Sequence, residues 1–235
     1  SVEGVMQEKG DLLKSLGPGG KAILNADDPR VIQLASKTKA EVILYGLSRE
    51  AAIRAKDVNE TQHTISFTLI FAGESIPIHL NCHGHFMVSN ALAAAAVGYQ
   101  TGLSCETVKT GIEAFKPVSG RMNIKHMPGG IHLIDDTYNA NPASMAAGLK
   151  TLKQLAAGKS VAVIGDMLEL GRAAGEAHYG VGRLLAELGI DYAAVGGEFR
   201  LTVLQGALDH GFVRQNIRLF DDKDDAALWI KDLAR

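Results

Sequence analysis

The second half of the chain alternates short apolar runs with helical patterns, and this alternation limits the fold more than any other feature. The runs are Ile131–Ile134, Val161–Ile164, Tyr192–Val195 and Ile217–Phe220, each followed by about ten residues with helical spacing. Strands separated by helices of this length predict a parallel, doubly wound sheet, so we expect a Rossmann-like domain. The Gly-x-Gly-x-x-Gly fingerprint is absent from the sequence, which argues against a dinucleotide cofactor.

The first half is also of α/β type, but it is less regular. We expect strands at Lys21–Asn25 and Glu41–Tyr45, an antiparallel hairpin within Ile53–Leu80 and an alanine-rich helix at Met87–Gln100. Lys116–Gly120 has the composition of a linker. The predicted domains are therefore residues 1–118 and 119–235.

The composition excludes several functional classes. With 24 Lys+Arg against 26 Asp+Glu the formal net charge is -2, which provides no attraction to nucleic acid or to an anionic membrane. No apolar stretch is long enough to insert into a membrane. Two cysteines make no disulfide framework, so we expect a cytoplasmic protein.

The stretch Ile131–Pro142 is the first candidate site. Asp135 and Asp136 follow an apolar run at once, and Asn141 with Pro142 predicts an N-cap and first residue of a helix. We interpret the run as a buried strand of the parallel sheet, with the carboxylates at its carboxyl end, where open α/β sheets bind ligands. The alternative is a solvated loop with an ordinary helix cap.

A second acidic turn follows the run Val161–Ile164. Asp166 and Glu169 would again lie at the carboxyl end of a strand. Two such turns at the edge of one parallel sheet would strengthen the prediction of a ligand crevice there.

Two further positions have open interpretations. Arg121, next to the linker, can bind a phosphate through its planar guanidinium, or it is an ordinary surface arginine. His85 precedes the alanine-rich helix, whose N-terminus would suit a nucleotide. A zinc cluster of His79, Cys82, His83 and His85 is the less favoured alternative, because the spacing matches no standard site.

Taken together, the motifs resemble the Mur ligases over nearly the whole chain. They run in the order of that family: Glu8–Asp11, Asn25–Asp28, Gly84–His85, Asn90–Ala94, Ser119–Met122, Asp135–Pro142 and Gly165–Gly171. The last two stretches look like the D-alanyl-D-alanine-adding member of the family. The resemblance implies a truncated central ATPase domain followed by the Rossmann-like ligase domain.

The activity implied by this resemblance is ATP-dependent amide ligation in peptidoglycan synthesis. ATP would phosphorylate a carboxylate of UDP-N-acetylmuramoyl-tripeptide, and the amine of D-alanyl-D-alanine would attack the acyl phosphate. ATP and Mg2+ are the implied cofactors, because the transferred phosphoryl group carries charge that must be neutralised. A monomer is expected.

The resemblance also implies roles for the residues of the ATP site. Asn90 would contact the adenine, Asp136 the ribose hydroxyls and Arg121 the phosphates, with His85 beside the nucleotide. Asn139 and Asn141 would shape the ATP cleft.

The remaining implied roles concern the metal and the second substrate. Lys9 falls where members of the family carry a carbamylated lysine, an anion that helps to bind Mg2+, so Lys9 and Arg121 are the expected catalytic residues. Asp166 and Glu169 would position the dipeptide.

The sequence also departs from the family pattern. The phosphate-binding loop of the family is missing, and Phe86 stands where many members have Asn. We therefore expect a fragment that is inactive by itself and binds ATP weakly. The rival hypotheses are a ligase similar to folylpolyglutamate synthase and a non-catalytic nucleotide-binding module.

Overall fold

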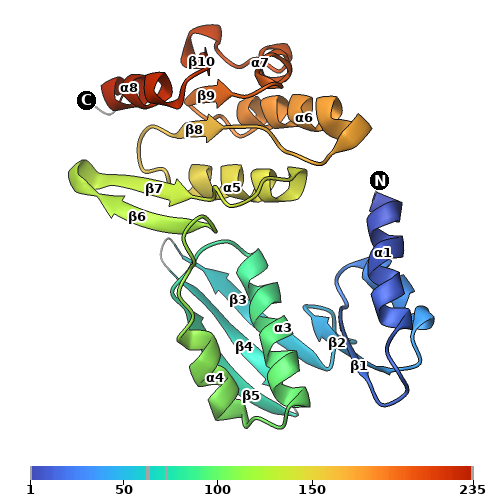
Figure 1. Cartoon of the computed structure of the whole chain (residues 1–235). Helices are drawn as coiled ribbons and strands as arrows, with labels where there is room; N and C mark the ends of the chain where they lie inside the picture. Colours follow the sequence, from blue (N-terminus) through green and yellow to red (C-terminus); the bar gives the residue numbers. More distant parts are fainter. Residues whose placement is uncertain (1, 62–63, 72, 234–235) are drawn as a thin grey trace. The chain divides into compact units, whose positions relative to one another are not determined.

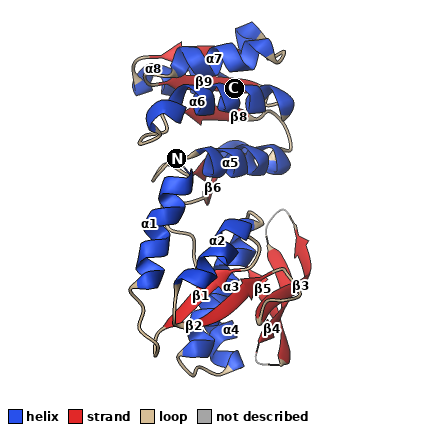
Figure 2. Cartoon of the chain, turned by 90° about the vertical axis from the view of Figure 1, so that its right-hand side faces the viewer, coloured by secondary structure: helices blue, strands red, loops and turns tan. Residues whose placement is uncertain are grey.

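A computed structural model describes residues 2–61, 64–71 and 73–233. The chain divides into two compact units, residues 1–116 and 117–235. The predicted α/β fold class is confirmed, since each unit contains parallel strands connected through helices (Figure 1; Figure 2, strands red and helices blue). Among the described helices, none has the length and hydropathy needed to cross a bilayer.

The first unit is a mixed sheet with helices packed on it. Its elements are α1 (Val2–Lys14), β1 (Lys21–Asn25), α2 (Pro29–Leu34), a 3-10 turn (Ala35–Lys37), β2 (Glu41–Gly46), β3 (Ile53–Glu60), β4 (Ile65–Phe71), β5 (Glu74–Leu80), α3 (Phe86–Gln100) and α4 (Cys105–Glu113). In the described residues the strand order is β1-β2-β3-β4-β5, with β1, β2 and β3 parallel and β3, β4 and β5 antiparallel.

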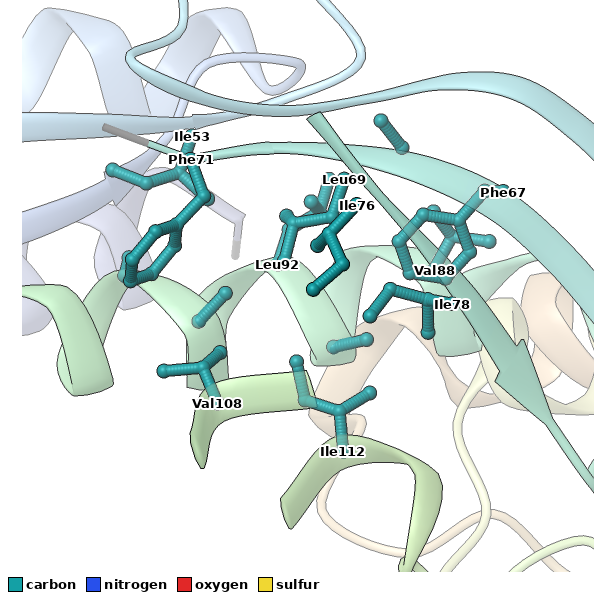
Figure 3. Close-up of a cluster of buried hydrophobic side chains, with 14 of the residues drawn as sticks. Ile53, Phe67, Leu69, Phe71, Ile76, Ile78, Val88, Leu92, Val108 and Ile112 are labelled. Carbon is teal, nitrogen blue, oxygen red and sulfur yellow. The ribbon is translucent and has the colours of Figure 1, made fainter. Parts of the chain in front are cut away.

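The core of this unit follows from the alternation in β4. Ile65, Phe67 and Leu69 are at most 3% exposed, while the residues between them are only partly buried. In the antiparallel register Phe67 lies opposite Ile78, so the next strand presents its apolar side chains to the same face. Leu92 of α3 packs into this face (Figure 3), which fixes the alanine-rich helix against the sheet.

The second unit contains a hairpin, a parallel sheet and its helices. Its elements are β6 (Asn123–Met127), a 3-10 turn (Pro128–Gly130), β7 (Ile131–Asp135), α5 (Pro142–Leu155), β8 (Val161–Ile164), a 3-10 turn (Gly171–Ala173), α6 (Ala174–Glu187), β9 (Tyr192–Gly196), α7 (Arg200–Asp209), a 3-10 turn (Arg214–Asn216), β10 (Ile217–Phe220) and α8 (Lys223–Leu233). Within the described residues β10, β9 and β8 form a parallel sheet in that order.

Helices α6 and α7 cross at very short distance. A Cβ added to Gly182 would lie 2.0 Å from the backbone oxygen of Val203, and one added to Gly206 would lie 2.1 Å from that of Tyr179. Only glycine allows this approach, because any larger residue would push the two backbones apart. The close crossing fixes the position of α6 relative to α7, and with it the starting points of the two helices.

The predicted place of the Ile131–Ile134 run in the parallel sheet is wrong. This run belongs to β7, which pairs antiparallel with β6 in the described residues and not with β8. It is not buried either, since Ile131 is 44% and Leu133 47% exposed. A short apolar run does not distinguish a buried parallel strand from a hairpin strand, and here the hairpin partner Asn123–Met127 decides.

Candidate functional site

The end of β7 is bonded to the segment that connects the two units. Asp135 accepts hydrogen bonds from the Ser119 hydroxyl (3.3 Å), the Gly120 N–H (3.2 Å) and the Thr137 hydroxyl (2.8 Å). It also accepts one from the Lys125 ammonium at 3.0 Å. All four donors converge on a side chain that is 14% exposed, so this carboxylate is a structural anchor.

The same contacts set the protonation of Asp135. The hydroxyl of Thr137, followed by the ammonium of Lys125, lowers the pKa of Asp135 from 3.8 to about 2. Lys125 lies on β6 diagonally across from Asp135, so the ion pair depends on the hairpin register. The carboxylate therefore stays charged at any physiological pH.

Asp136 points to a different group of neighbours. One carboxylate oxygen accepts the Met122 N–H at 3.0 Å. The other faces α5 at Gly148, where an added Cβ would lie 3.7 Å away. Asp136 is only half-buried, so it keeps acceptor capacity beyond the Met122 bond.

The backbone segment that carries Arg121 is bonded beside this carboxylate. The Tyr138 N–H donates to the Gly120 carbonyl at 2.9 Å, which joins the two segments on either side of Arg121 and Asp136. The Arg121 guanidinium lies 4.1 Å from the centre of the Tyr138 ring, a cation–π contact. Tyr138 is 69% exposed, so the ring and the guanidinium are accessible to a ligand. Sequence analysis named Arg121 and Asp136, and both lie in this one cluster.

The two asparagines that follow are bound locally. The side chain of Asn139 accepts the Ala140 N–H at 2.9 Å. The side chain of Asn141 accepts the N–H groups of Ala143 and Ser144, and the Ser144 hydroxyl accepts the Asn141 N–H. This capping box confirms the predicted N-cap with Pro142 at the first helical position. The oxygen of each side chain is thereby engaged, while the amide nitrogens keep their donors.

His85 and Asn90 lie in the first unit, at the start of α3. His85 is the exposed N-cap residue, although its side chain makes no capping hydrogen bond. Asn90 is exposed one turn further on and contacts only the Met87 sulfur, at 3.7 Å, among the described contacts. Their neighbour Ser89 bonds the Tyr45 phenol at the carboxyl end of β2. The start of α3 therefore lies beside the ends of parallel strands, where α/β sheets bind ligands.

Lys9 is exposed on α1 and forms no ion pair with the residues that the structure describes. Its helix is anchored through Gly10, where an added Cβ would lie 3.1 Å from Leu34 of α2. The ammonium thus projects from a fixed helix.

A ready metal cage is absent from the described part of the chain. Residues 2–61, 64–71 and 73–233 hold no group of three or more His, Cys, Asp or Glu side chains placed to bind one ion. Burial and the nearby Glu60 raise the pKa of Cys82 to about 11, so this thiol is neutral and poorly suited to a zinc ligand.

The second acidic turn does follow a strand of the parallel sheet. Asp166 accepts the N–H groups of Glu198 (2.7 Å) and Phe199 (3.0 Å) at the start of α7. A Cβ added to Gly197, whose φ is +95°, would lie 2.4 Å from this carboxylate. Asp166 thus fills the position in which the loop after β9 would otherwise bind an anion. Glu169 is exposed and has φ +61°, an unusual conformation for a side chain of this kind.

The prediction that both acidic turns lie on one sheet edge is wrong. Asp136 follows the β6–β7 hairpin, whereas Asp166 follows β8 in the parallel sheet. The two turns therefore do not share the edge of one parallel sheet.

Sequence reasoning missed His178, which is 1% exposed on α6. Its Nε2 accepts the Met167 N–H at 2.9 Å, in the middle of the second acidic turn. No local sequence pattern marks this contact, because the two residues lie eleven positions apart in the chain.

These features define a class: a two-unit α/β protein with a guanidinium, an aromatic ring and a carboxylate grouped at one hairpin end. The chain belongs to the Mur ligase family. The Mur ligase middle domain matches residues 1–98, and the Mur ligase, glutamate ligase domain matches residues 120–235.

Several of the similar proteins carry the same name, and others are ligases that act on other substrates. The UDP-N-acetylmuramoyl-tripeptide–D-alanyl-D-alanine ligase of Mycobacterium tuberculosis is 35% identical over 249 residues, covering 97% of this chain and 48% of the relative. The Escherichia coli protein of the same name is 34% identical over 194 residues, covering 81% of this chain and 42% of the relative. A crystal structure of MurF from Acinetobacter baumannii superimposes with TM-score 0.87 at 28% identity. The superposition covers 99% of this chain and 49% of the MurF chain. The chain spans about half the length of the curated relatives it matches.

Proposed function

We propose that this chain forms part of an ATP-dependent amide ligase that adds D-alanyl-D-alanine to UDP-N-acetylmuramoyl-tripeptide in peptidoglycan synthesis. The observation that carries the proposal is the cluster at the end of β7, which brings Arg121, Asp136 and Tyr138 together. The names of the curated relatives supply the substrates. Residues 1–118 would be part of the central ATP-binding domain and residues 119–235 the ligase domain.

In this proposal the cluster binds the nucleotide. The free oxygen of Asp136 accepts hydrogen bonds from the ribose hydroxyls, and the planar guanidinium of Arg121 binds the phosphates through paired N–H donors. The ring of Tyr138 holds the guanidinium in place through the cation–π contact. Asn139 and Asn141 turn their amide donors toward the nucleotide, since their oxygens are already bonded. Such positioned charges stabilise the transferring phosphoryl group.

The first unit would contact the nucleotide through residues at the start of α3. Asn90 contacts the adenine, and His85 lies beside the nucleotide at the start of α3, where the positive end of the helix dipole favours anions. Lys9, as a carbamate, would take part in holding Mg2+, an ion that neutralises phosphate charge when bound. The lack of a group of three metal-binding side chains among the described residues is compatible with Mg2+, because this ion is usually held by one or two carboxylates together with phosphates and waters.

The second acidic turn would receive the dipeptide. Asp166 is committed to the start of α7, so we assign the direct contact to Glu169, whose exposed carboxylate can pair with the ammonium group. The adjacent Leu168 is 73% exposed and can contact the methyl groups of the two alanines.

The proposal is tested by a coupled assay of phosphate release on the intact gene product that contains this chain. Asp136→Asn keeps an oxygen for the Met122 N–H but replaces the ribose acceptor by a donor, so the KM for ATP should rise about tenfold or more. Asp225→Asn, in the exposed first turn of α8, is the matched control and should leave the KM unchanged.

The choice of substrates is tested in the same assay. Turnover should require UDP-N-acetylmuramoyl-tripeptide and D-alanyl-D-alanine, whereas a folate substrate with glutamate should give none. Turnover of the folate pair alone would replace the proposal by its nearest rival. Absence of any ATP-dependent ligation, with normal folding, would favour a non-catalytic module.

A further inference from the structure

The turn after β8 is held at both ends and projects in the middle. Met167 is 2% exposed and packs into the core of the second unit, and the preceding Asp166 is bonded to the loop before α7. Leu170, on the far side, packs partly against the same core. Leu168 and Glu169 alone in this stretch are held out from the protein, so their position depends on how firmly Met167 is held.

His178 supplies the bond that holds Met167. The Met167 N–H donates to Nε2 of His178 at 2.9 Å, a contact between a loop amide and a fully buried ring. Because Nε2 accepts, the ring proton must lie on Nδ1, which bonds the Ala174 carbonyl at 2.7 Å within α6. The helix therefore fixes both the tautomer and the direction of the ring.

A second set of contacts ties the same ring to the neighbouring loop. The His178 ring stacks on Phe199 with centroids 4.3 Å apart and an angle of 14° between the planes. The Phe199 N–H in turn donates to Asp166, which precedes Met167 in the chain. These contacts close a cycle through His178, Phe199, Asp166 and Met167. The loop after β8 and the loop before α7 therefore cannot shift independently.

We propose that His178 is a positioning residue for the amine-donating substrate. By accepting the Met167 N–H it holds Leu168 and Glu169 in the geometry that receives a zwitterionic dipeptide. This inference rests on the proposed function for the identity of the dipeptide, whereas the holding of the turn rests on the geometry alone. His178 itself contacts no substrate.

Two substitutions separate the roles of the ring. His178→Phe preserves the stacking on Phe199 but removes the acceptor, and His178→Gln places an oxygen where Nε2 lies. In the intact gene product His178→Phe should raise the KM for D-alanyl-D-alanine about tenfold, the effect expected for one lost buried hydrogen bond. The kcat and the KM for ATP should change less than about twofold, and His178→Gln should restore most of the lost affinity.

The chain offers a matched control on the next helix. His210 makes the same kind of bond within its own helix, from Nδ1 to the Gly206 carbonyl at 2.9 Å, but it is exposed at the end of α7. His210→Phe should leave the KM for the dipeptide unchanged. If His178→Phe fails to fold, His178→Asn replaces it, because this shorter side chain still reaches the Ala174 carbonyl but not Met167.

Hydrogen exchange of the Met167 amide provides a readout that does not depend on turnover. Exchange should accelerate in His178→Phe and stay slow in His178→Gln. Rapid exchange with an unchanged dipeptide KM would overturn the inference, and so would slow exchange in both variants. If the unsubstituted protein does not use D-alanyl-D-alanine at all, the proposed function fails and the dipeptide role fails with it, while the exchange rates still decide whether His178 holds the turn.

Discussion

Two adjacent aspartates at the end of β7 have the same chemistry but different tasks. Asp135 is enclosed by four donors, and Asp136 keeps an oxygen available. The difference comes from the donors that each side chain meets: two hydroxyls, a backbone N–H and an ammonium bond Asp135, whereas Asp136 accepts the Met122 N–H. Asp135 thereby fixes the segment that carries Arg121, and the second oxygen of Asp136 keeps its acceptor capacity.

The role of Asp135 predicts an effect of acid. Its lowered pKa means that its stabilising contribution is complete above the ordinary value of 3.8 and is lost as the pH falls toward about 2. Thr137→Val removes the strongest cause of the shift, so the pKa should rise toward 3.8 and the loss of stability should begin at higher pH. A titration of the Asp135 carboxyl carbon by NMR measures the pKa, and urea unfolding at a series of pH values measures the loss of stability. Ser36→Ala, at an exposed site in the first unit, should leave the titration unchanged. An identical curve for Thr137→Val would contradict the assigned cause.

At the scale of residues, the sequence allows prediction of those contacts that depend only on neighbours along the chain. The Asn141 cap and Pro142 could be predicted because the capping rule is local. The anchoring of Asp135 by Lys125 could not, because it requires the register of a hairpin that the apolar pattern alone does not reveal. His178 was missed for the same reason, since the Met167 N–H that it accepts is eleven residues away in the sequence.

At the scale of elements, exposure decides where β7 belongs. Ile131 and Leu133 lie on one face of the hairpin, and His132 lies on the other, opposite His126 with the two rings 4.7 Å apart. Alternation of this kind suits a two-stranded hairpin, while a strand inside a parallel sheet is apolar on both faces. The strands β8, β9 and β10 could be predicted because they are short, apolar and separated by helices.

The outer edge of β5 is covered by side chains from α4. The Glu113 carboxylate accepts the His79 N–H at 2.9 Å and the Lys109 ammonium at 2.6 Å, and Lys109 also donates to the Pro77 carbonyl at 2.6 Å. These bonds occupy backbone groups that an edge strand would otherwise expose to another chain.

Removal of this cover should be measurable. Glu113→Ala should lower the free energy of unfolding by about 1 kcal/mol and accelerate exchange of the His79 amide, because water replaces the lost acceptor only in part. Glu113→Gln keeps an acceptor oxygen and should cost less. Although burial raises the pKa of Glu113, Lys109 and the His79 N–H lower it overall, so this contribution is lost as the pH falls below 4.5. Exchange of the His79 amide that stays as slow in Glu113→Ala as in the unsubstituted protein would show that Glu113 does not protect the edge.

At the scale of the whole molecule, each unit has a core of its own. Among the described residues, one buried cluster runs from Ile43 to Ile112 and the other from Leu149 to Ile217, with no residue in common. The predicted boundary after residue 118 lies within the linker-like stretch Lys116–Gly120. The chain divides into its two units after residue 116, two residues earlier. Separate cores allow each unit to keep its internal geometry while the other changes.

Separate cores predict that the units unfold separately, and two leucines test this. Leu92 in the first core and Leu185 in the second are both 0% exposed, so each Leu→Ala change should cost about 2–5 kcal/mol in its own unit. Trp229, the only tryptophan of the sequence, contacts Tyr192 and Phe220 and therefore reports the second unit by fluorescence.

The expected results differ between the two variants. Leu185→Ala should shift the fluorescence transition to a lower urea concentration, and Leu92→Ala should leave the transition in place. Hydrogen exchange of the β4 amides, in the first unit, should accelerate in Leu92→Ala and stay unchanged in Leu185→Ala. If both variants shift both signals equally, the two cores form one cooperative unit, and the cluster at the end of β7 cannot be treated as a property of the second unit alone.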